Sequence, residues 1–363
     1  MRKLNQRTHT KTKAAQALVA STQEAMNTGL VVATHGRHCV VELDDGMRII
    51  CHPRGKKSQS VVGDRVRWQA AADEGTIESV LERKNLFYRR DEVRTKSFAA
   101  NLDQVLILLA AEPEFSETQL SRALIAAEAE HIKPLIVMNK SDLPDSFAQA
   151  WHRLAAYRNM GYTVLPLELK SPNAENTSLQ RLQADMLGKT TLILGPSGAG
   201  KSTLVNALVP NARALTGEIS QALNSGKHTT TSTSLYWVGQ KTWNTTENGN
   251  SNSNSNSNSN SNSNSNSNSN SNSKGTAIID SPGFQEFGLQ HIPQNQLASC
   301  MPDLKQHVPN CKFYNCTHLH EPGCGVLSAL QKDESAELLA SELSQRRHRI
   351  YTQLFEELGQ QRW

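Results

Sequence analysis

The glycine-rich stretch GPSGAGKST, at residues 195–203, constrains the fold of this chain more than any other feature. It follows the apolar run TTLIL at 190–194 and precedes STLVNALV at 202–209, a helical pattern. A loop between a buried strand and a helix predicts a doubly wound α/β domain, with a mostly parallel sheet and helices on both faces. The apolar runs at 105–109 and 135–138 have the length and composition of further buried strands.

The residue types in this stretch are those that bind phosphate groups. Glycines let backbone N–H groups turn toward phosphate oxygens, and the start of the following helix adds its positive dipole. Lys201 would neutralise the outer phosphates during binding and catalysis, and the Ser202 hydroxyl would coordinate Mg²⁺. The residues predicted to form this part of the site are Gly195, Pro196, Ser197, Gly198, Ala199, Gly200, Lys201, Ser202 and Thr203.

A second stretch, NKSD at 139–142, predicts which base the nucleotide carries. The Asp142 carboxylate can accept hydrogen bonds from the ring N–H and the exocyclic amine of guanine, whereas adenine would leave that charge unpaired. Asn139 would hold the base and its loop, and the stem of Lys140 would cover one face of the ring. The match by itself also fits an ordinary strand-to-helix turn, so a P-loop ATPase with a coincidental NKSD is the alternative.

Two more stretches supply what a GTP site needs around the γ-phosphate. DSPG at 280–283 follows the strand pattern TAIID, so that Asp280 would hold Mg²⁺ through water and the Gly283 N–H would sense the γ-phosphate. Upstream, GKHTTTST contains three threonines, one of which would close over Mg²⁺ as a switch. These candidates are Thr229, Thr230 and Thr231.

The residue that would orient the attacking water is less evident. Many GTPases place a glutamine at or near the position after Gly283, but here that residue is Phe284, which cannot align water. His228, next to the threonines, is the candidate for orienting or deprotonating the water. The alternative is a solvent-exposed loop histidine without a catalytic role.

The order of these elements along the chain is unusual, because the guanine loop precedes the phosphate loop. Transferring the segment before about residue 185 to the end of the domain restores the usual GTPase order. Termini of compact domains often lie close together, so such a circular permutation is physically tolerable. The order therefore predicts a circularly permuted GTPase core.

The segment before this core reads as a small β-barrel. Five short β-rich runs between residues 29 and 97 are separated by turn signals, which suggests an OB-type barrel. Basic residues at its edges suggest RNA binding, although scattered surface charge would look the same. Within the core, residues 250–273 alternate strictly between Asn and Ser, which predicts a disordered insert in a surface loop.

A cysteine-rich segment near the C-terminus predicts a metal centre. Cys311, Cys316, His318 and Cys324 offer three thiolates and an imidazole, the ligand set of a closed, structural Zn²⁺ site. His320 is a rival for the imidazole position, and Cys300 is a more distant alternative thiol. The helical pattern that follows carries basic residues, for which a structural role is the simpler interpretation.

Charge and hydropathy exclude several other classes of protein. No apolar run approaches the roughly 20 residues of a membrane span, and the N-terminus lacks the features of a secretory signal, so the expected location is the cytoplasm. The net charge of +4 is modest, but only basic charges occur before Glu24. This basic arm is either a solvated tail or a segment that folds onto RNA phosphates.

Nearly the whole chain resembles one known family, the circularly permuted GTPases of small ribosomal subunit biogenesis, called RsgA or YjeQ. The matching stretches are VGDRV, ANLDQVLIL, MNKSDL, GPSGAGKSTLVNAL, GKHTTTST, IDSPGFQEFGL and CTHLHEPGCGV. The resemblance implies an OB domain, a permuted GTPase core and a zinc domain. It also implies GTP hydrolysis that the small subunit stimulates during late maturation. By position it favours His318 over His320 as zinc ligand, and it assigns the family's histidine catalyst to His228.

The resemblance leaves two departures. The Asn-Ser tract is not a family feature, and the loop that would help hold the base aligns with ELK at 168–170, where no residue is assigned. The expected protein is a monomer that binds GTP or GDP, the small subunit and its rRNA; a nucleotide-regulated RNA-binding scaffold with incidental hydrolysis is the rival. The predicted domains are a basic arm at 1–28, an OB fold at 29–98, a GTPase core at 99–290 and a zinc-binding α-helical unit at 291–363.

Overall fold

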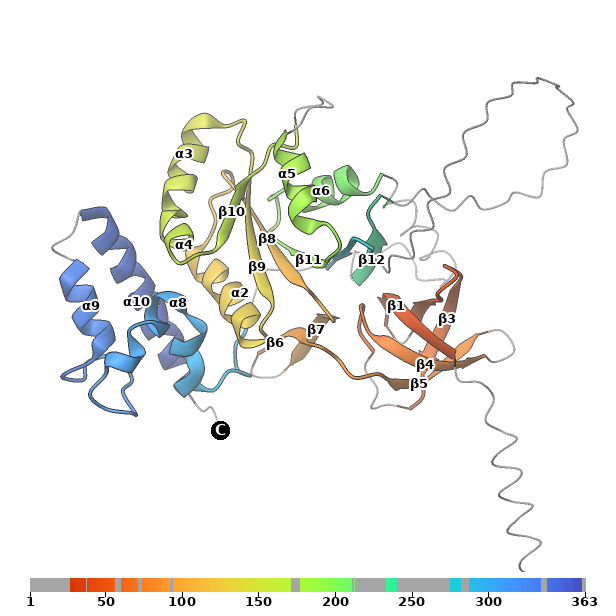
Figure 1. Ribbon diagram of the computed structural model, residues 1–363, viewed down its shortest axis with the longest axis horizontal. Coiled ribbons are helices and arrows are strands. Elements are labelled where there is room, and N and C mark those ends of the chain that lie inside the picture. The colour runs from red at the N-terminus through yellow and green to blue at the C-terminus, as the bar shows by residue number, and fades with distance from the viewer. Residues whose placement is uncertain are drawn as a thin grey trace, which may run out of the picture.

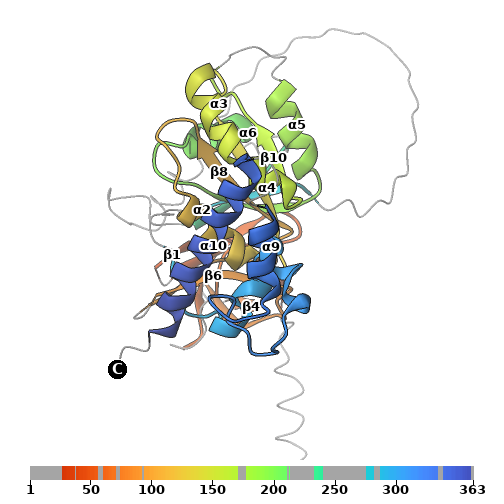
Figure 2. The ribbon, with the colours of Figure 1, turned by 90° about the vertical axis from the view of Figure 1, so that its left-hand side faces the viewer.

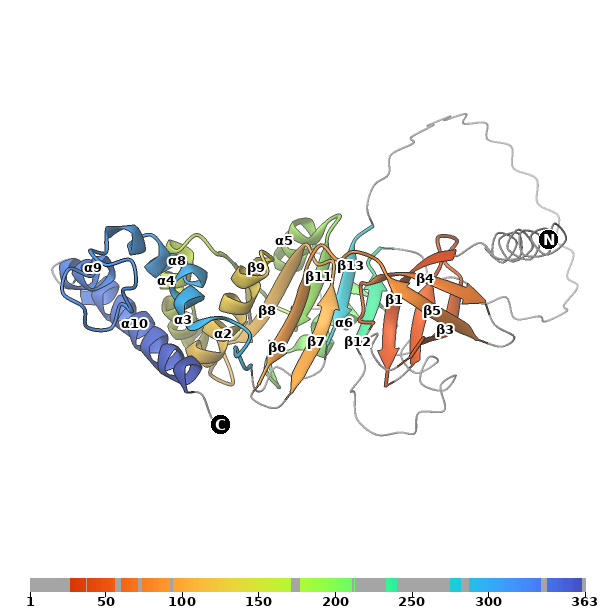
Figure 3. The ribbon, with the colours of Figure 1, turned by 90° about the horizontal axis from the view of Figure 1, so that it is seen from below.

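Three units lie in a row in the computed structural model: a β-barrel, a central α/β layer and a helical C-terminal unit (Figures 1 and 3). The structure describes residues 27–36, 38–55, 60–70, 74–91, 94–170, 177–210, 212, 233–239, 275–281, 287–333 and 338–360. The Asn-Ser tract and residues 1–26 of the predicted arm lie outside these ranges. Within these ranges, no helix combines the length and the apolar character that a membrane crossing requires.

The N-terminal unit is a closed five-stranded barrel, as the sequence predicted. Its strands are β1 (Asn27–His35), β2 (His38–Glu42), β3 (Arg48–Pro53), β4 (Arg65–Ala70) and β5 (Gly75–Val80). Neighbouring strands pair in the order β1-β2-β3-β5-β4, and β4 pairs with β1 to close the barrel. Alternate residues of the strands point inward and form its apolar core, which comprises Val31, Cys39, Val41, Cys51, Val66, Trp68 and Ile77.

The central layer is a mostly parallel sheet, which confirms the predicted α/β core. Its strands are β8 (Gln104–Ala110), β9 (Lys133–Asn139), β10 (Thr163–Pro166), β11 (Thr190–Leu194), β12 (Thr233–Trp237) and β13 (Ala277–Asp280). Their order is β10-β9-β8-β11-β13-β12, with only the β12–β13 pair antiparallel. Every residue of β8 is buried, as expected for a strand covered on both faces.

Helices cover both faces of this sheet. The helices are α2 (Glu117–Ala129), α3 (Pro144–Arg153), α4 (Ala155–Asn159), α5 (Thr177–Met186) and α6 (Lys201–Leu208). One face of the sheet packs against α2, α3 and α4, and the opposite face packs against α5 and α6. The side chain of Ser116 caps the first turn of α2 by accepting a hydrogen bond from the Gln119 N–H.

The barrel is joined to the central layer by backbone pairing as well as by the chain. Strand β1 pairs antiparallel with β12, so that barrel and core share one sheet of eleven strands in the described part of the chain. The indole N–H of Trp237 on β12 donates to Glu42 on β2 at 2.6 Å. Between barrel and core, β6 (Leu86–Arg90) and β7 (Thr95–Ala100) form a separate hairpin. The predicted domain boundaries stay predictions.

The C-terminal unit packs against the α2 and α4 side of the core (Figure 2). It contains η1 (Gln294–Cys300), α8 (Pro302–Lys305), η2 (Val308–Asn310), α9 (Gly325–Asp333) and α10 (Leu338–Gly359). Arg347 of α10 is 3% exposed; its guanidinium binds Asp303 at 2.9 and 3.2 Å and donates to the Ser121 hydroxyl of α2 at 2.6 Å. This buried charge, bonded through each of its three guanidinium nitrogens, holds α10 on the core.

Candidate nucleotide site and metal centre

The glycine-rich loop connects β11 to α6, the context that a phosphate loop requires. Gly198 and Gly200 have φ angles of +82° and +97°, and Gly200 precedes the first turn of α6. Left-handed residues of this kind turn successive N–H groups toward one point, which creates an anion-binding concavity at the helix start. Ser202 and Thr203 of the first turn are exposed, so their hydroxyls are accessible to a ligand.

Lys201 already lies beside the carboxylate predicted to act with Mg²⁺. Its ammonium donates to Asp280 Oδ1 at 2.8 Å and to the Ser281 carbonyl at 2.5 Å. The parallel pairing of β11 with β13 explains this contact, because Ile193 lies opposite Asp280 and the two strands end side by side. A cation, a carboxylate and an anion-binding loop therefore meet at one edge of the sheet, the arrangement that a Mg²⁺-nucleotide needs.

The loop after β9 contacts the phosphate loop directly. The Asn139 side-chain amide donates to the Ala199 carbonyl at 2.9 Å, and Asn139 is only 4% exposed. A Cβ atom on Gly200 would lie 2.4 Å from the same amide nitrogen, so this glycine makes the close approach possible. Asn139 is thus bonded to the phosphate loop although the chain runs from one loop to the other through α3, α4, β10, α5 and β11.

Asp142, three residues after Asn139, has a buried carboxylate oxygen. Among the described residues its Oδ1 has no hydrogen-bond partner, while Oδ2 lies 3.2 Å from the Lys170 ammonium. Lys170 is 73% exposed, and an ion pair with so exposed a partner contributes only about 0–1 kcal/mol, so it opposes a ligand weakly. An unpaired carboxylate oxygen is the group that would accept the N–H donors of guanine.

The side chain of Lys140 connects the loop after β9 to the segment after β8. Its φ angle is +66°, and its ammonium donates to the Glu112 carbonyl in the segment after β8. The lysine stem therefore spans from the β9 loop to the β8 loop. Both loops leave parallel strands at their carboxyl ends, where ligands of open α/β sheets bind.

The catalytic and switch residues predicted from sequence lie outside the described residues. These residues are His228, Thr229, Thr230, Thr231 and Gly283. Their predicted roles therefore stay predictions. The described residues next to them along the chain are Thr233 at the start of β12 and Ser281 after β13, and their hydroxyls lie 3.5 Å apart.

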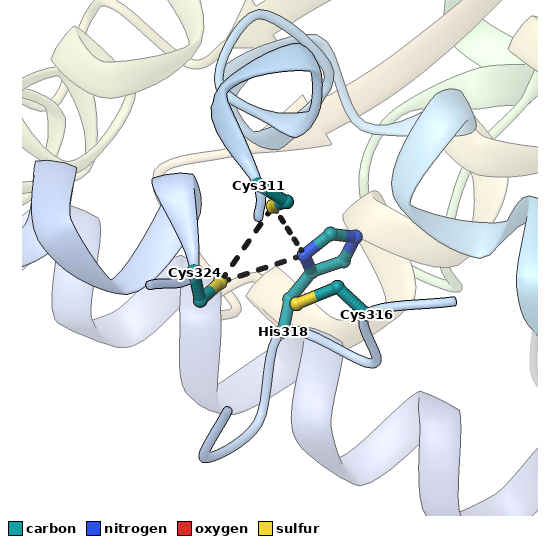
Figure 4. Close-up of side chains that lie close together, drawn as sticks. All are labelled: Cys311, Cys316, His318 and Cys324. Carbon is teal, nitrogen blue, oxygen red and sulfur yellow. Dashed lines mark hydrogen bonds between the residues drawn. The ribbon is translucent and has the colours of Figure 1, made fainter. Parts of the chain in front are cut away.

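The four predicted metal ligands lie together in the C-terminal unit (Figure 4). Tetrahedral zinc with Zn–S bonds of about 2.3 Å and a Zn–N bond of about 2.05 Å places sulfurs about 3.8 Å apart and sulfur about 3.6 Å from nitrogen. The observed separations are 4.0 Å between the sulfurs of Cys311 and Cys324, and 3.4 and 3.6 Å from these sulfurs to His318 Nδ1. Cys316 completes a set whose ligand atoms all lie within 4.8 Å. The residues fit a tetrahedral metal ion, and His320 and Cys300 are not part of the set.

Protonation of this cluster depends on its surroundings. Burial lowers the pKa of His318, which favours the neutral imidazole that binds metal. Burial, together with the neighbouring thiols of Cys324 and Cys311, raises the pKa of Cys316 to about 12. The Cys316 thiol is therefore protonated at neutral pH without a cation, so metal binding would release its proton.

Hydrogen bonds around the cluster hold the ligands in place. Backbone N–H groups of Gly325 and Leu327 lie 3.3 and 3.5 Å from the sulfurs of Cys311 and Cys324, respectively. The Glu321 carboxylate accepts hydrogen bonds from the backbone of Thr317, Leu319 and His320. Burial opposes its charge, but these bonds and the Thr317 hydroxyl lower the pKa of Glu321 well below its usual range.

Sequence reasoning missed two residues at these sites, Lys170 and Glu321, and one that holds α10 on the core, Arg347. Lys170 follows β10 in the ELK stretch, where no residue had been assigned, and its position at the carboxyl end of the next parallel strand was the available signal. Arg347 lies in the basic helix whose structural role was preferred, and its partners Asp303 and Ser121 are too distant in sequence to predict. Glu321 lies between the metal ligands in the sequence, and no sequence pattern distinguished it as a residue that bonds to the ligand loop.

Comparisons with known proteins agree with this geometry. A family model described as RsgA GTPase matches residues 80–245. The small ribosomal subunit biogenesis GTPase RsgA of Variovorax paradoxus is 59% identical over 339 residues, 93% of this chain and 94% of that protein. The protein of the same name from Paraburkholderia phytofirmans is 46% identical over 336 residues, 92% of this chain and 93% of that protein.

Solved structures give the same picture. YjeQ from Thermotoga maritima has a TM-score of 0.63 at 26% identity, covering 93% of this chain and 99% of that one. YloQ, described as a circularly permuted GTPase, has a TM-score of 0.60 at 24% identity and covers 94% and 99% of the two chains, and this likeness supports the fold.

Fold and loop order together define a circularly permuted P-loop GTPase. The NKSD loop after β9 precedes the phosphate loop after β11 along the chain, yet the two meet in space. Given a relative that is 59% identical over nearly its whole length, the chain belongs to the RsgA family of GTPases. The resemblance predicted from the sequence is confirmed.

Proposed function

We propose that this protein is a cytoplasmic, monomeric GTPase of late small-subunit maturation. It binds the maturing small ribosomal subunit in its GTP form, hydrolyses GTP when the subunit stimulates it, and then dissociates. The observation that carries the GTPase part is the contact of Asn139 with Ala199, which joins the base loop to the phosphate loop. The ribosomal part rests on relatives named small ribosomal subunit biogenesis GTPase RsgA.

The loops that meet at the sheet edge each bind a different part of the nucleotide. Asp142 accepts the guanine N–H groups, Asn139 braces the base loop, and the Lys140 stem covers the ring. The backbone of residues 195–200 surrounds the phosphates, and Lys201 turns from Asp280 to the β- and γ-phosphates when they enter. Ser202 and, through water, Asp280 would hold Mg²⁺, which would supply neutralisation of the phosphate charge.

Hydrolysis requires residues of the two segments beside β12 and β13. His228 orients or deprotonates the attacking water, one of the threonines 229–231 closes over the γ-phosphate, and the Gly283 N–H senses that phosphate. The role of His228 is supported by chemistry: the phenyl ring of Phe284 cannot align a water molecule, whereas an imidazole can accept a proton from that water.

The flanking units hold the ribosome. The OB barrel and the C-terminal unit grip rRNA, and a structural Zn²⁺ on the four ligands stabilises the fold of the second of these. Direct hydrogen bonding of both units to the core supports a mechanical link between nucleotide state and rRNA contact.

The deciding experiment is GTP turnover with and without purified small subunits. We expect the subunits to accelerate phosphate release, and we expect His228→Ala to retain GTP binding while losing the acceleration. An equal rate with and without subunits would refute the proposal, and undiminished stimulation in His228→Ala would remove that residue from the mechanism. Release of the protein from subunits with a non-hydrolysable GTP analogue bound would favour the scaffold alternative.

A further inference from the structure

We propose that the outer face of the barrel carries a second metal site, formed by His38, His52 and Glu74. The strand register brings these residues together. Cys39 on β2 lies opposite Cys51 on β3, and Cys51 lies opposite Gly75 on β5. The two cysteines point into the barrel core, so the residues next to them point outward on the same face.

The three side chains meet on that outer face. One possible ligand atom from each lies within 4.8 Å of those from the other two. The rings of His38 and His52 have centroids 5.1 Å apart, and the His52 Nε2 atom contacts the Glu74 carboxylate. His38 Nδ1 is buried and has no hydrogen-bond partner in the described part of the chain, so a cation bound at that nitrogen would satisfy it.

The ligand types define the class of metal. Two imidazoles and a carboxylate suit Zn²⁺ and neighbouring first-row transition ions, whereas Mg²⁺ and Ca²⁺ prefer an all-oxygen set. Three protein ligands leave a coordination position for water, in contrast to the closed set of the cysteine centre. The side chains of His52 and Glu74 are 44% and 38% exposed, so a hydrated ion can reach them.

The site differs from the cysteine centre in place and in what it joins. The barrel and the C-terminal unit lie at opposite ends of the molecule (Figure 1), so the two centres bind independently. Its ligands come from β2, β3 and the residue before β5, so a bound ion would cross-link three strands of the barrel. His35 lies opposite His38 on β1 and adds a further imidazole to the same row, outside the 4.8 Å cluster.

Metal stoichiometry tests this proposal on untagged, full-length protein whose cysteine centre holds one equivalent of zinc. Equilibrium dialysis against micromolar Zn²⁺ at pH 7.5, with metal counted by mass spectrometry, should give two equivalents for the native protein. The double variant H38Q/H52Q should bind one, and Glu74→Gln should weaken the second site at least about tenfold. His152→Gln, at an exposed histidine on α3, serves as the matched control and should still bind two.

Two results would overturn the proposal. One is saturation of the native protein at one equivalent, and the other is retention of the second equivalent in H38Q/H52Q. Circular dichroism and the melting temperature without added zinc confirm that this variant keeps its barrel. As a second measurement, excess Zn²⁺ should raise the melting temperature of the native protein and of His152→Gln but leave that of H38Q/H52Q unchanged.

Discussion

Replacement of Asp142 by asparagine should convert the base preference of the site. Among the residues that the structure describes, Asp142 Oδ1 is buried without a hydrogen-bond partner, and Oδ2 pairs with the exposed Lys170. Guanine would supply two hydrogen bonds to this charged acceptor, worth about 1.5–3 kcal/mol each. In Asp142→Asn an amide N–H₂ faces the guanine amine, so at least about 3 kcal/mol is lost, which is at least about 100-fold in GDP affinity. Xanthine carries an oxygen in place of that amine and should regain most of the loss.

The assay is fluorescence titration with labelled GDP and with the matching xanthosine diphosphate. Asp145→Asn makes the same chemical change at an exposed position on α3 and should leave both affinities unchanged. Circular dichroism checks that Asp142→Asn is folded. Unchanged GDP preference in the folded Asp142→Asn protein would refute the assignment of Asp142 to guanine.

Three further predictions concern stability and metal. Arg347→Met should lower the free energy of unfolding by about 3 kcal/mol in a urea titration, because it leaves Asp303 unpaired, while exposed Arg349→Met should change it little. Chelation of the metal should make residues 311–324 sensitive to protease, with protection returning on addition of zinc; equal resistance with chelator would contradict a structural metal. Burial, followed by the charge of Arg90, lowers the pKa of His291 to about 4. The unfolded state therefore binds the extra proton between about pH 6.5 and 4, and stability should fall as pH falls through that window. His291→Gln should flatten this part of the stability curve.

Local patterns were sufficient to predict the architecture of the barrel and core. The apolar run at β8 predicted a strand buried on both faces, and all seven residues of β8 are buried. The turn-separated strands predicted a barrel, which β4 closes onto β1. The pairing of β1 with β12 was not predictable, because register between strands so distant in sequence depends on tertiary packing that period-2 patterns do not encode.

The candidate sites were predictable to different degrees. The cysteine centre could be predicted from the sequence because its ligands lie within one short segment. All four ligands meet in space. The role of Asp142 could be predicted from its motif. Its ion pair with Lys170 could not, because it joins loops that follow two different strands. The cluster of His38, His52 and Glu74 could not be predicted from the sequence, because its members come together only through the register of three strands.

Circular permutation explains how the extra units attach to the GTPase core. The phosphate-loop strand β11 lies between β8 and β13 in the sheet. The barrel and the β6–β7 hairpin precede β8, while the C-terminal unit follows β13, so both attached units continue from neighbours of β11. The Gly288 carbonyl accepts a hydrogen bond from the Arg90 N–H at 3.1 Å, and Phe287 stacks on Phe98 of the hairpin. The chain that leaves the Asp280 strand is therefore bonded to the hairpin before it reaches the metal centre. In an unpermuted core the chain would run from β13 on into β8, so neither strand could continue directly into a flanking unit.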